Sequence, residues 1–318
     1  MLRVAGAVFR GAGAWLVTLV CGSYGSVALA QDPAEQSADP PDIVEAAALP
    51  IHAIWGDKVL SESKFYRRLE RSQSICFGEV HNSAGDHYAQ SRALRALTKK
   101  LAQRKHSRHR GCGRPEFAVG FEMFQRPAQP ALDGYIAGTL SEAELITQSQ
   151  YNQRWGYDFG FYRPLLERAR DLDLTALALN ARTELTRKIG RTGLASLTPE
   201  EQAEMPELDL EDLEHKTFIY SLFGVIPGHG EPAFLTNLYA AQTTWDETMA
   251  ETASEWLTES GDDSQLMVFA GLVHCHRSAI PRRITRRTGI ETLAVSPIFA
   301  SELAAFPGAG VGTAPSAH

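Results

Sequence analysis

Four apolar, strand-like runs in the chain each end on a charged or metal-capable side chain. They are ICFG before Glu79, AVGF before Glu122, ALAL before Asn180, and LMVFAG followed by LV and His274. The carboxyl ends of the strands in a parallel sheet open onto one crevice. The sequence therefore predicts that the polar side chains after these four runs converge on one site.

The spacing of the runs indicates the fold class. Strands are expected at 74–78, 117–121, 174–179, 266–270 and 292–295, and helices at about 61–71, 84–103, 161–172, 234–258 and 281–288. Strands that alternate with such helices favour an α/β fold, with a mostly parallel β-sheet flanked by helices. Residues 182–232 are predicted to be a helical insertion that forms a smaller subdomain.

Residues 1–30 have the pattern of a secretory signal peptide, with two arginines, an apolar stretch and small residues at Ala28 and Ala30. We expect cleavage after Ala30, because the apolar run is shorter than the ~20 residues that span a membrane. A lipoprotein anchor at Cys21 is less favoured, since Val20 stands where a small residue is preferred. The mature protein is expected to be secreted across the inner membrane and to be periplasmic or surface-associated.

The mature chain is expected to be an acidic, soluble protein. Residues 31–50 are predicted to be a flexible leader, 51–300 the α/β domain and 301–318 a disordered tail. Removal of residues 1–30 takes away two arginines and no acid, so the formal charge of −7 becomes −9. An acidic balance argues against a nucleic-acid partner. No later apolar run reaches the length of a membrane span.

Three cysteines follow the predicted cleavage site: Cys76, Cys112 and Cys275. Their spacing matches no zinc or redox motif, and an exported protein meets an oxidising compartment. Cys76 lies inside an apolar strand and is interpreted as a small buried hydrophobic residue. The pairing of Cys112 with Cys275 is left open.

The segment GEVHNSAGDHYAQ at 78–90 holds the densest group of candidate site residues. Glu79 and His81 are two positions apart, so both side chains project from the same face of an extended strand end. His87 and Gln90 share one face of the following helix. The start of that helix, after Asn82 or Ser83, would direct free N–H groups at an anion.

The other strand ends leave alternatives open. Glu122 either contacts a ligand or pairs with Arg182, because an unpaired buried carboxylate is costly. His274 has a side chain that suits a transition metal or haem iron. The aromatic segment WGYDFGFYRP at 155–164 is either core packing or a surface for a cofactor, and its Tyr162 could hold ferric haem as tyrosinate.

Several common enzyme signatures are missing from the sequence: the Walker loop, GxGxxG after a strand, the GxSxG elbow and HExxH. Their absence argues against phosphoryl transfer, classical dehydrogenases, α/β-hydrolases and common zinc proteases.

Five segments in this order resemble the ChaN-type haem-binding uptake family of the Tiki and erythromycin-esterase-like superfamily. They are GEVHNSAGDHYAQ, GFEMFQRPAQPALDGY, WGYDFGFYRPLLERARDLDLTALALNARTELTRKI, LYAAQTTWDETMAE and VFAGLVHC. The similarity covers about residues 51–295. It implies an exported or surface-attached bacterial protein, associated with haem or iron uptake or storage.

The resemblance also implies roles for single residues. The family holds haem through a tyrosine, and Tyr162 matches it in the recurrent Tyr-x-Pro element. Two protomers of the family can bring two haems face to face, which implies a homodimer, and a haem-uptake transporter or receptor is an implied partner. His229 in PGHGEP matches another family histidine.

In the wider superfamily, the matching positions form a metal-dependent hydrolytic centre. Here they are Glu79, His81, Glu122 and His274. The family usually has Gly-Asn-Gly-His where this chain has Gly-Leu-Val-His before Cys275. The loss of small residues weakens the transfer of a role to His274.

Two functions therefore remain open. The favoured one is a haem-binding protein in which Tyr162 holds the iron, with His87, Asn180 and His229 as further candidate haem contacts. Arg182, the helix start after Asn82 or the basic loop at 99–114 would neutralise the propionates. The alternative is a metal-dependent hydrolase, in which His81, His274 and a carboxylate hold a divalent ion and Glu79 or Glu122 acts as general base.

Overall fold

A computed structural model of the chain describes residues 2–5, 52–55, 58–99, 101, 116–225, 227 and 232–298. The predicted leader at 31–50, the tail at 301–318 and nearly all of the basic loop lie outside these residues.

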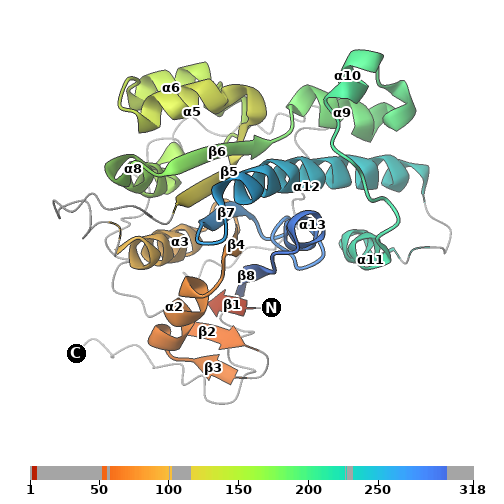
Figure 1. Cartoon of the computed structure of the whole chain (residues 1–318). Coiled ribbons are helices and arrows are strands. Elements are labelled where there is room, and N and C mark those ends of the chain that lie inside the picture. The colour runs from red at the N-terminus through yellow and green to blue at the C-terminus, as the bar shows by residue number, and fades with distance from the viewer. Residues whose placement is uncertain are drawn as a thin grey trace, which may run out of the picture.

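One eight-stranded sheet runs through the protein in the order β3-β2-β1-β8-β4-β7-β5-β6 (Figure 1). The five strands β8, β4, β7, β5 and β6 are all parallel to their neighbours, which confirms the predicted α/β class. They span Thr292–Ile298, Ser74–Glu79, Gln265–Gly271, Phe117–Gln125 and Thr175–Asn180. The strands β1, β2 and β3, at Leu2–Ala5, His52–Trp55 and Lys58–Leu60, extend one edge.

The register of the central strands positions the site. Glu79 at the end of β4 stands opposite Gly271 at the end of β7. The pairing of β5 with β6 shifts register between Phe121 and Gln125. Such irregularities redirect side chains, and Glu122 lies inside this one.

Helices cover both faces of the sheet (Figure 1). On one face, Phe77, Phe121 and Leu165 belong to a large apolar core. The helices on this side are α2 Glu62–Glu70, α3 Ala84–Leu97, α5 Gln129–Ile136, α6 Glu142–Gln148, α7 Tyr151–Arg154 and α8 Arg163–Leu172, with the short η2 Arg126–Ala128 and η3 Phe159–Phe161. On the other face, α12 Ala233–Ser260 and α13 Ile280–Thr288 pack on Cys76, Val268 and their neighbours.

The predicted insertion contains short helices. They are α9 Thr183–Thr192, η4 Leu194–Ser196, α10 Pro199–Ala203 and α11 Leu213–Ser221. Leu185 and Ile189 of α9 pack against Ala240 and Ala241 of α12. The insertion therefore packs against α12, the long helix that also contributes Asp246 to the site.

Cys76 and Cys275 form a disulfide, with their Cα atoms 5.3 Å apart. The interpretation of Cys76 as a simple buried hydrophobic residue was therefore wrong, and Cys275 does not pair with Cys112, which lies outside the described residues. Strand alternation turns Cys76 toward α12 and α13, on the face opposite Ile75 and Phe77. The turn after β7 brings Cys275 to that same face.

The N-terminal strand lies inside the predicted signal peptide. β1 pairs in parallel with β8 and antiparallel with β2. Cleavage after Ala30 would remove β1 and would leave the five parallel strands that position the site. No helix among the described residues is long and apolar enough to cross a membrane.

The disulfide generates a stability prediction. We expect the double variant Cys76→Ala, Cys275→Ala to lose about 2–5 kcal/mol of unfolding free energy, because the bridge closes a long loop in the unfolded chain. Urea unfolding with and without a reducing agent measures this loss, and reductant should lower the stability of the wild type only. Cys112→Ser is the matched control. Labelling of Cys76 and Cys275 in unreduced, unfolded protein would contradict the bridge.

Candidate functional site

A buried carboxylate, Glu79, ends β4 and is enclosed by donors. Its Oε1 accepts a hydrogen bond from the Tyr162 hydroxyl at 2.6 Å and lies 2.9 Å from His81 Nδ1. Its Oε2 accepts from Gln90 Nε2 at 2.9 Å. These contacts lie on the face covered by α3 and α8, so Gln90 and Tyr162 link both helices to the strand end.

A second buried carboxylate, Glu122 of β5, lies on the α12 face. Its Oε2 accepts from the Gly271 backbone N–H at 2.6 Å, and its Oε1 lies 3.3 Å from His274 Nε2. The other ring nitrogen of His274, Nδ1, lies 2.6 Å from Asp246 Oδ1 of α12. His274 therefore bridges two carboxylates.

His81 and Gly271 join the two groups. A Cβ atom added to Gly271 would lie 2.8 Å from His81 Cε1 and 3.6 Å from Glu122 Oε2. The absence of a side chain at Gly271 thus leaves the space that the His81 ring occupies. The structure confirms that Glu79, His81, Glu122 and His274 converge at the carboxyl edge of the sheet.

The carboxylates stay charged although they are buried. Burial opposes the charge of Glu79, but the charge of His87 and the hydrogen bonds from His81 and Tyr162 outweigh it and lower the pKa of Glu79 to about 2. Burial likewise opposes the charged form of His274, yet Glu122 and Asp246 raise its pKa to about 10. The pKa of His81 is also raised, since Glu79 and Glu122 outweigh its burial.

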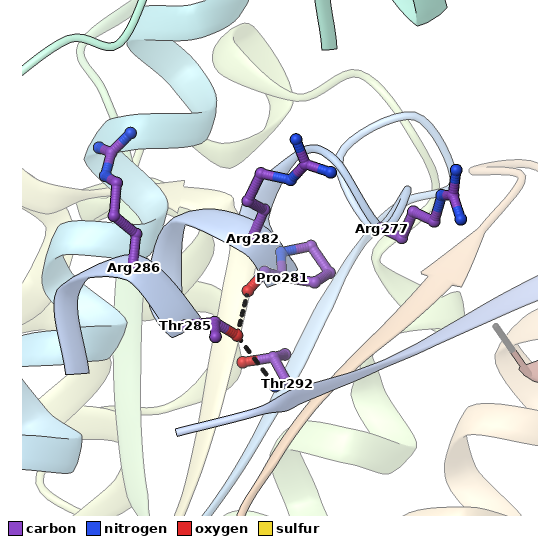
Figure 2. Close-up of a pocket in the computed structure, with 6 residues that line it drawn as sticks. All are labelled: Arg277, Pro281, Arg282, Thr285, Arg286 and Thr292. Atoms are coloured by element: carbon purple, nitrogen blue, oxygen red, sulfur yellow. Dashed lines mark hydrogen bonds between the residues drawn. The ribbon is translucent and has the colours of Figure 1, made fainter. Parts of the chain in front are cut away.

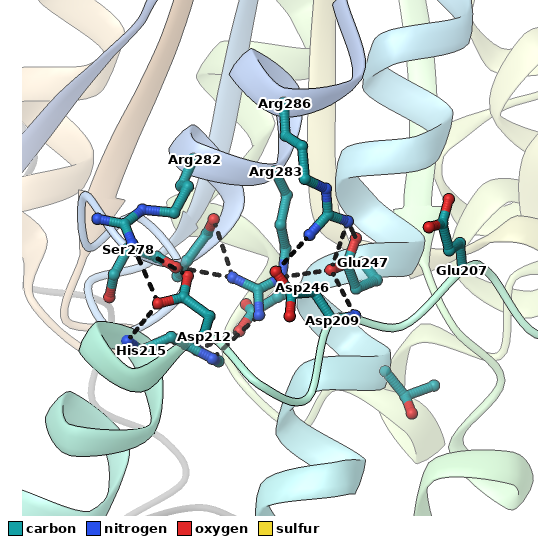
Figure 3. A network of polar contacts seen from close by, with 12 residues as sticks. Glu207, Asp209, Asp212, His215, Asp246, Glu247, Ser278, Arg282, Arg283 and Arg286 are labelled. Atoms are coloured by element: carbon teal, nitrogen blue, oxygen red, sulfur yellow. Dashed lines mark hydrogen bonds and ion pairs between the residues drawn. The ribbon is translucent and has the colours of Figure 1, made fainter.

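The chain of buried charges continues beyond the site (Figure 3). Asp246 Oδ2 lies 3.0 Å from His215 Nε2, and an Arg283 guanidinium nitrogen lies 3.0 Å from His215 Nδ1. Arg283 pairs with Glu247, which Arg286 also contacts. The sequence reasoning missed Asp246, although an acid in the apolar middle of the long helix α12 was the available signal.

Aromatic rings surround His81. The ring of Trp155 lies 4.7 Å from the His81 ring, and that of Tyr157 lies 4.9 Å from it. Trp155, Tyr157 and Phe161 are partly exposed, whereas Phe159 and Tyr162 are buried. The aromatic segment therefore does both things that the sequence left open. Its buried residues pack in the core, and its partly exposed residues border the site.

Tyr162 is in the site, but its hydroxyl is enclosed. The residue is 1 % exposed, and its hydroxyl accepts a hydrogen bond from Trp155 Nε1 at 3.0 Å while it donates to Glu79. Burial and the charge of Glu79 raise the pKa of the Tyr162 phenol well above its ordinary value.

The other predicted residues are placed as follows. His87 is buried, stacks on Phe161 and lies 3.0 Å from the carbonyl oxygen of His81. Asn180 donates to the backbone carbonyl of Glu122. The predicted pair of Glu122 with Arg182 was wrong, because Arg182 contacts Glu204 and His274 takes its place at Glu122. His229 lies outside the described residues.

The helix start predicted to contact an anion is capped within the chain. The Ser83 side chain accepts from the Asp86 N–H, and the Asp86 carboxylate accepts from the Val80 N–H. The Ser83 contact satisfies an N–H group in the first turn of α3, and the Asp86 contact ties that turn to the end of β4.

The predicted metal ligands do not form a metal-type cluster. Within the described ranges, no group of three or more His, Cys, Asp or Glu side chains has the arrangement to hold a metal ion. Both nitrogens of His274 face carboxylates, and a protonated imidazole has no lone pair for a metal. His81 keeps one nitrogen, Nε2, for which the described residues provide no hydrogen-bond partner.

A separate cavity of about 360 Å³ lies beside α13 and β8 (Figure 2). Three arginines line it together with Pro281, Thr285 and Thr292: Arg277, Arg282 and Arg286. Each arginine contacts an acid, since Arg277 and Arg282 pair with Glu214 and Arg286 pairs with Asp209. The arginines of this cavity are thus engaged in ion pairs, and the cavity is distinct from the convergent site.

Comparisons with known proteins agree with this architecture. A family model described as "Haem-binding uptake, Tiki superfamily, ChaN" matches residues 65–284. The solved structure of ChaN of Campylobacter jejuni, described as showing cofacial haem binding, has 18 % identity and a TM-score of 0.53, over 76 % of this chain and 86 % of that chain. This similarity supports the fold. No curated protein matches the sequence.

Two further solved structures are less similar. The effector domain RRSP of a MARTX toxin from Vibrio vulnificus has 16 % identity and a TM-score of 0.40, over 78 % of this chain and 36 % of that chain. An erythromycin esterase, EreC, has 11 % identity and a TM-score of 0.39, over 75 % of this chain and 72 % of that chain.

Two buried tyrosines provide a matched test of the Glu79 cluster. We expect Tyr162→Phe to lower the unfolding free energy by about 1.5–3 kcal/mol, because it removes a hydrogen bond to a charged group. Tyr151→Phe should cost nothing, since the buried Tyr151 hydroxyl has no hydrogen-bond partner among the described residues. Urea unfolding of both variants measures the difference, and equal losses would contradict the arrangement.

The raised pKa of His274 predicts a pH-dependent stability. The pKa of His274 in the folded protein, about 10, lies above its ordinary value of 6.5. The contribution of His274 to the free energy of unfolding is therefore complete below pH 6.5 and is lost as the pH rises through 10. We expect His274→Gln to cost about 3–5 kcal/mol at low pH, because two buried carboxylates lose their cation. The difference in unfolding free energy between wild type and variant should decrease from pH 6.5 to pH 10.

A nearby histidine is the control for this experiment. Burial and the charge of Arg277 lower the pKa of His276 to about 4, so His276 is neutral throughout that pH range. The stability gap of His276→Gln should be constant from pH 6.5 to pH 10. A constant gap for His274→Gln as well would show that His274 is not a buried cation.

Proposed function

The chain belongs to the ChaN-type haem-binding uptake family of the Tiki superfamily, and from this premise we propose that it binds haem at the carboxyl edge of its sheet. The proposal places the haem beside His81, where partly exposed aromatic rings lie next to an imidazole nitrogen that has no hydrogen-bond partner among the described residues. When bound, haem supplies the iron that such a protein would take up or store.

The residues at this edge fit the chemistry of haem. Haem is flat and largely apolar, so a binding site needs aromatic or apolar area and a few oriented polar groups. Trp155 and Tyr157 provide ring surface within 5 Å of His81. The His81 side chain is 23 % exposed, so an oriented polar group lies beside this ring surface. This combination is the observation that carries the proposal.

The propionates of haem need positively charged or N–H partners, and two of the predicted partners already make other contacts. Arg182 is already engaged by Glu204 at 2.7 Å, and the start of α3 is capped by its own side chains. The basic loop at 99–114 follows α3 and precedes the start of β5, at the edge of the sheet opposite to the site, so it is not proposed as the partner of the propionates.

Export is part of the proposal. A disulfide between Cys76 and Cys275 supports it, because structural disulfides persist in oxidising compartments such as the periplasm. The pattern of residues 1–30 supports cleavage after Ala30. We also retain as proposals the periplasmic or surface location, the homodimer, and a haem-uptake transporter or receptor as partner.

The hydrolase alternative is less well supported. It required His274 as a metal ligand, whereas Glu122 and Asp246 occupy both ring nitrogens. The pair of Glu79 and His81 resembles a general base held by a carboxylate, but no further observation identifies a substrate or a bound nucleophile. Haem binding is therefore the conclusion.

A haem titration tests the function. We expect ferric haem to give a saturable shift of the Soret band with the full-length or processed protein. The same preparation, purified without chelator, is analysed for bound divalent metal. Protein unfolded in urea is the control and should give no saturable shift. A linear, non-saturating response of the folded protein, together with stoichiometric zinc or manganese, would overturn haem binding and revive the metal alternative.

A further inference from the structure

The hydroxyl of Tyr162, the iron ligand that the family resemblance implies, is covered in this structure. The residue is 1 % exposed. Its hydroxyl donates a hydrogen bond to Glu79 at 2.6 Å and accepts one from Trp155 Nε1 at 3.0 Å. An oxygen that ligates iron needs an accessible lone pair, and the indole of Trp155 occupies the acceptor side of this oxygen. In this structure the tyrosine oxygen is therefore closed to iron.

The side chains around Tyr162 leave one direction of approach. Among the described residues, the hydrogen bonds and ring contacts of Tyr162 involve Glu79, His87, Tyr151 and Trp155. The first three are 2 %, 4 % and 1 % exposed, whereas Trp155 is partly exposed. The Trp155 ring lies 6.2 Å from the Tyr162 ring. A ligand that comes from solvent therefore reaches the Tyr162 oxygen through the space that the Trp155 ring fills.

Trp155 belongs to a short surface segment, residues 155–157, that lies between two anchored neighbours. Before it, Arg154 makes hydrogen bonds to two other side chains, and after it Phe159 is buried in the core. Gly156 has a φ of 83°, and a Cβ atom built on it would have no neighbour within 4 Å. The backbone beside Trp155 thus borders open space, so a rotation of this side chain disturbs few interior contacts.

We propose that Trp155 is a gating residue, whose indole covers the Tyr162 hydroxyl in the free protein and turns away when haem binds. This inference rests on the proposed function and deepens it, because it names the residue that controls access to the implied ligand. The ring of Trp155 lies 4.7 Å from that of His81, so the released space lies where the haem is proposed to bind. Opening breaks the hydrogen bond from Trp155, and haem binding therefore depends on the fraction of protein that is open.

Stopped-flow absorbance tests the gate by measuring the association of ferric haem with wild type, Trp155→Phe and Trp155→Leu. Both variants keep an apolar side chain and remove the N–H group that holds the closed state. We expect haem association to become roughly 3- to 10-fold faster, which corresponds to the loss of one hydrogen bond. The apparent haem affinity of Trp155→Phe should rise by a similar factor. Trp155→Leu keeps the test valid if Trp155→Phe fails to fold.

Tyr157→Phe is the matched control, because it removes a polar atom from another aromatic ring of the same segment. The Tyr157 ring contacts His81 and Trp155, but the described residues include no hydrogen bond between Tyr157 and Tyr162. Its haem association rate should match that of wild type. Iron-free protoporphyrin IX is the second control, since it needs no oxygen ligand, and it should associate equally fast with wild type and Trp155→Phe.

The outcomes separate the gate from haem binding. Equal haem association rates in wild type and both Trp155 variants would overturn the gate and leave haem binding intact. An equal acceleration of haem and protoporphyrin IX would do the same, because it indicates a general loosening of the site.

Resonance Raman spectroscopy checks that the gate controls the tyrosine. The wild-type haem complex should show phenolate vibrations that vanish in Tyr162→Phe. A wild-type complex without these vibrations, or their persistence in Tyr162→Phe, would overturn the gate because Tyr162 would not be the ligand. The absence of any saturable absorbance change in wild type would overturn haem binding itself.

Discussion

A carboxylate that stays charged inside the protein is the constraint on which the site depends. An unpaired buried carboxylate costs several kcal/mol, so Glu79 has to be surrounded by donors. Tyr162, Gln90 and His81 satisfy it, and they come from three different segments. One anion therefore fixes the start of α8, the middle of α3 and the turn after β4 relative to the sheet.

The sheet divides the site into two groups of charges. Glu79 faces α3 and α8, whereas Glu122 faces α12 with His274 and Asp246. His81 lies at the edge where the backbone of Gly271 separates the two carboxylates. It feels the field of both, which explains why its pKa is raised despite burial. The His274 side chain is less exposed than that of His81, at 12 % against 23 %, and its charge is satisfied by Glu122 and Asp246.

The sequence was informative where the chemistry is local. Apolar runs that end on polar residues predicted the parallel strands and their shared edge, and the two-residue spacing predicted that Glu79 and His81 project from the same face. The cation at Glu122 was not predictable in this way. It depends on which helix covers that face, and Asp246 of α12, far away in the chain, fixes His274 there. The partner of Cys76 lies 199 residues away, so the local apolar pattern predicted that Cys76 is buried but not that it forms a disulfide.

The position of Tyr162 shows why a matching motif does not fix a role. The phenol and Glu79 share one proton-donating contact, and the low pKa of Glu79 depends partly on it. Any process that draws Tyr162 away removes a donor from a buried anion, so Glu79 must gain another donor or take up a proton. Iron ligation by Tyr162 would therefore cost the free energy of its hydrogen bond to Glu79. This cost is large because Glu79 is buried and charged.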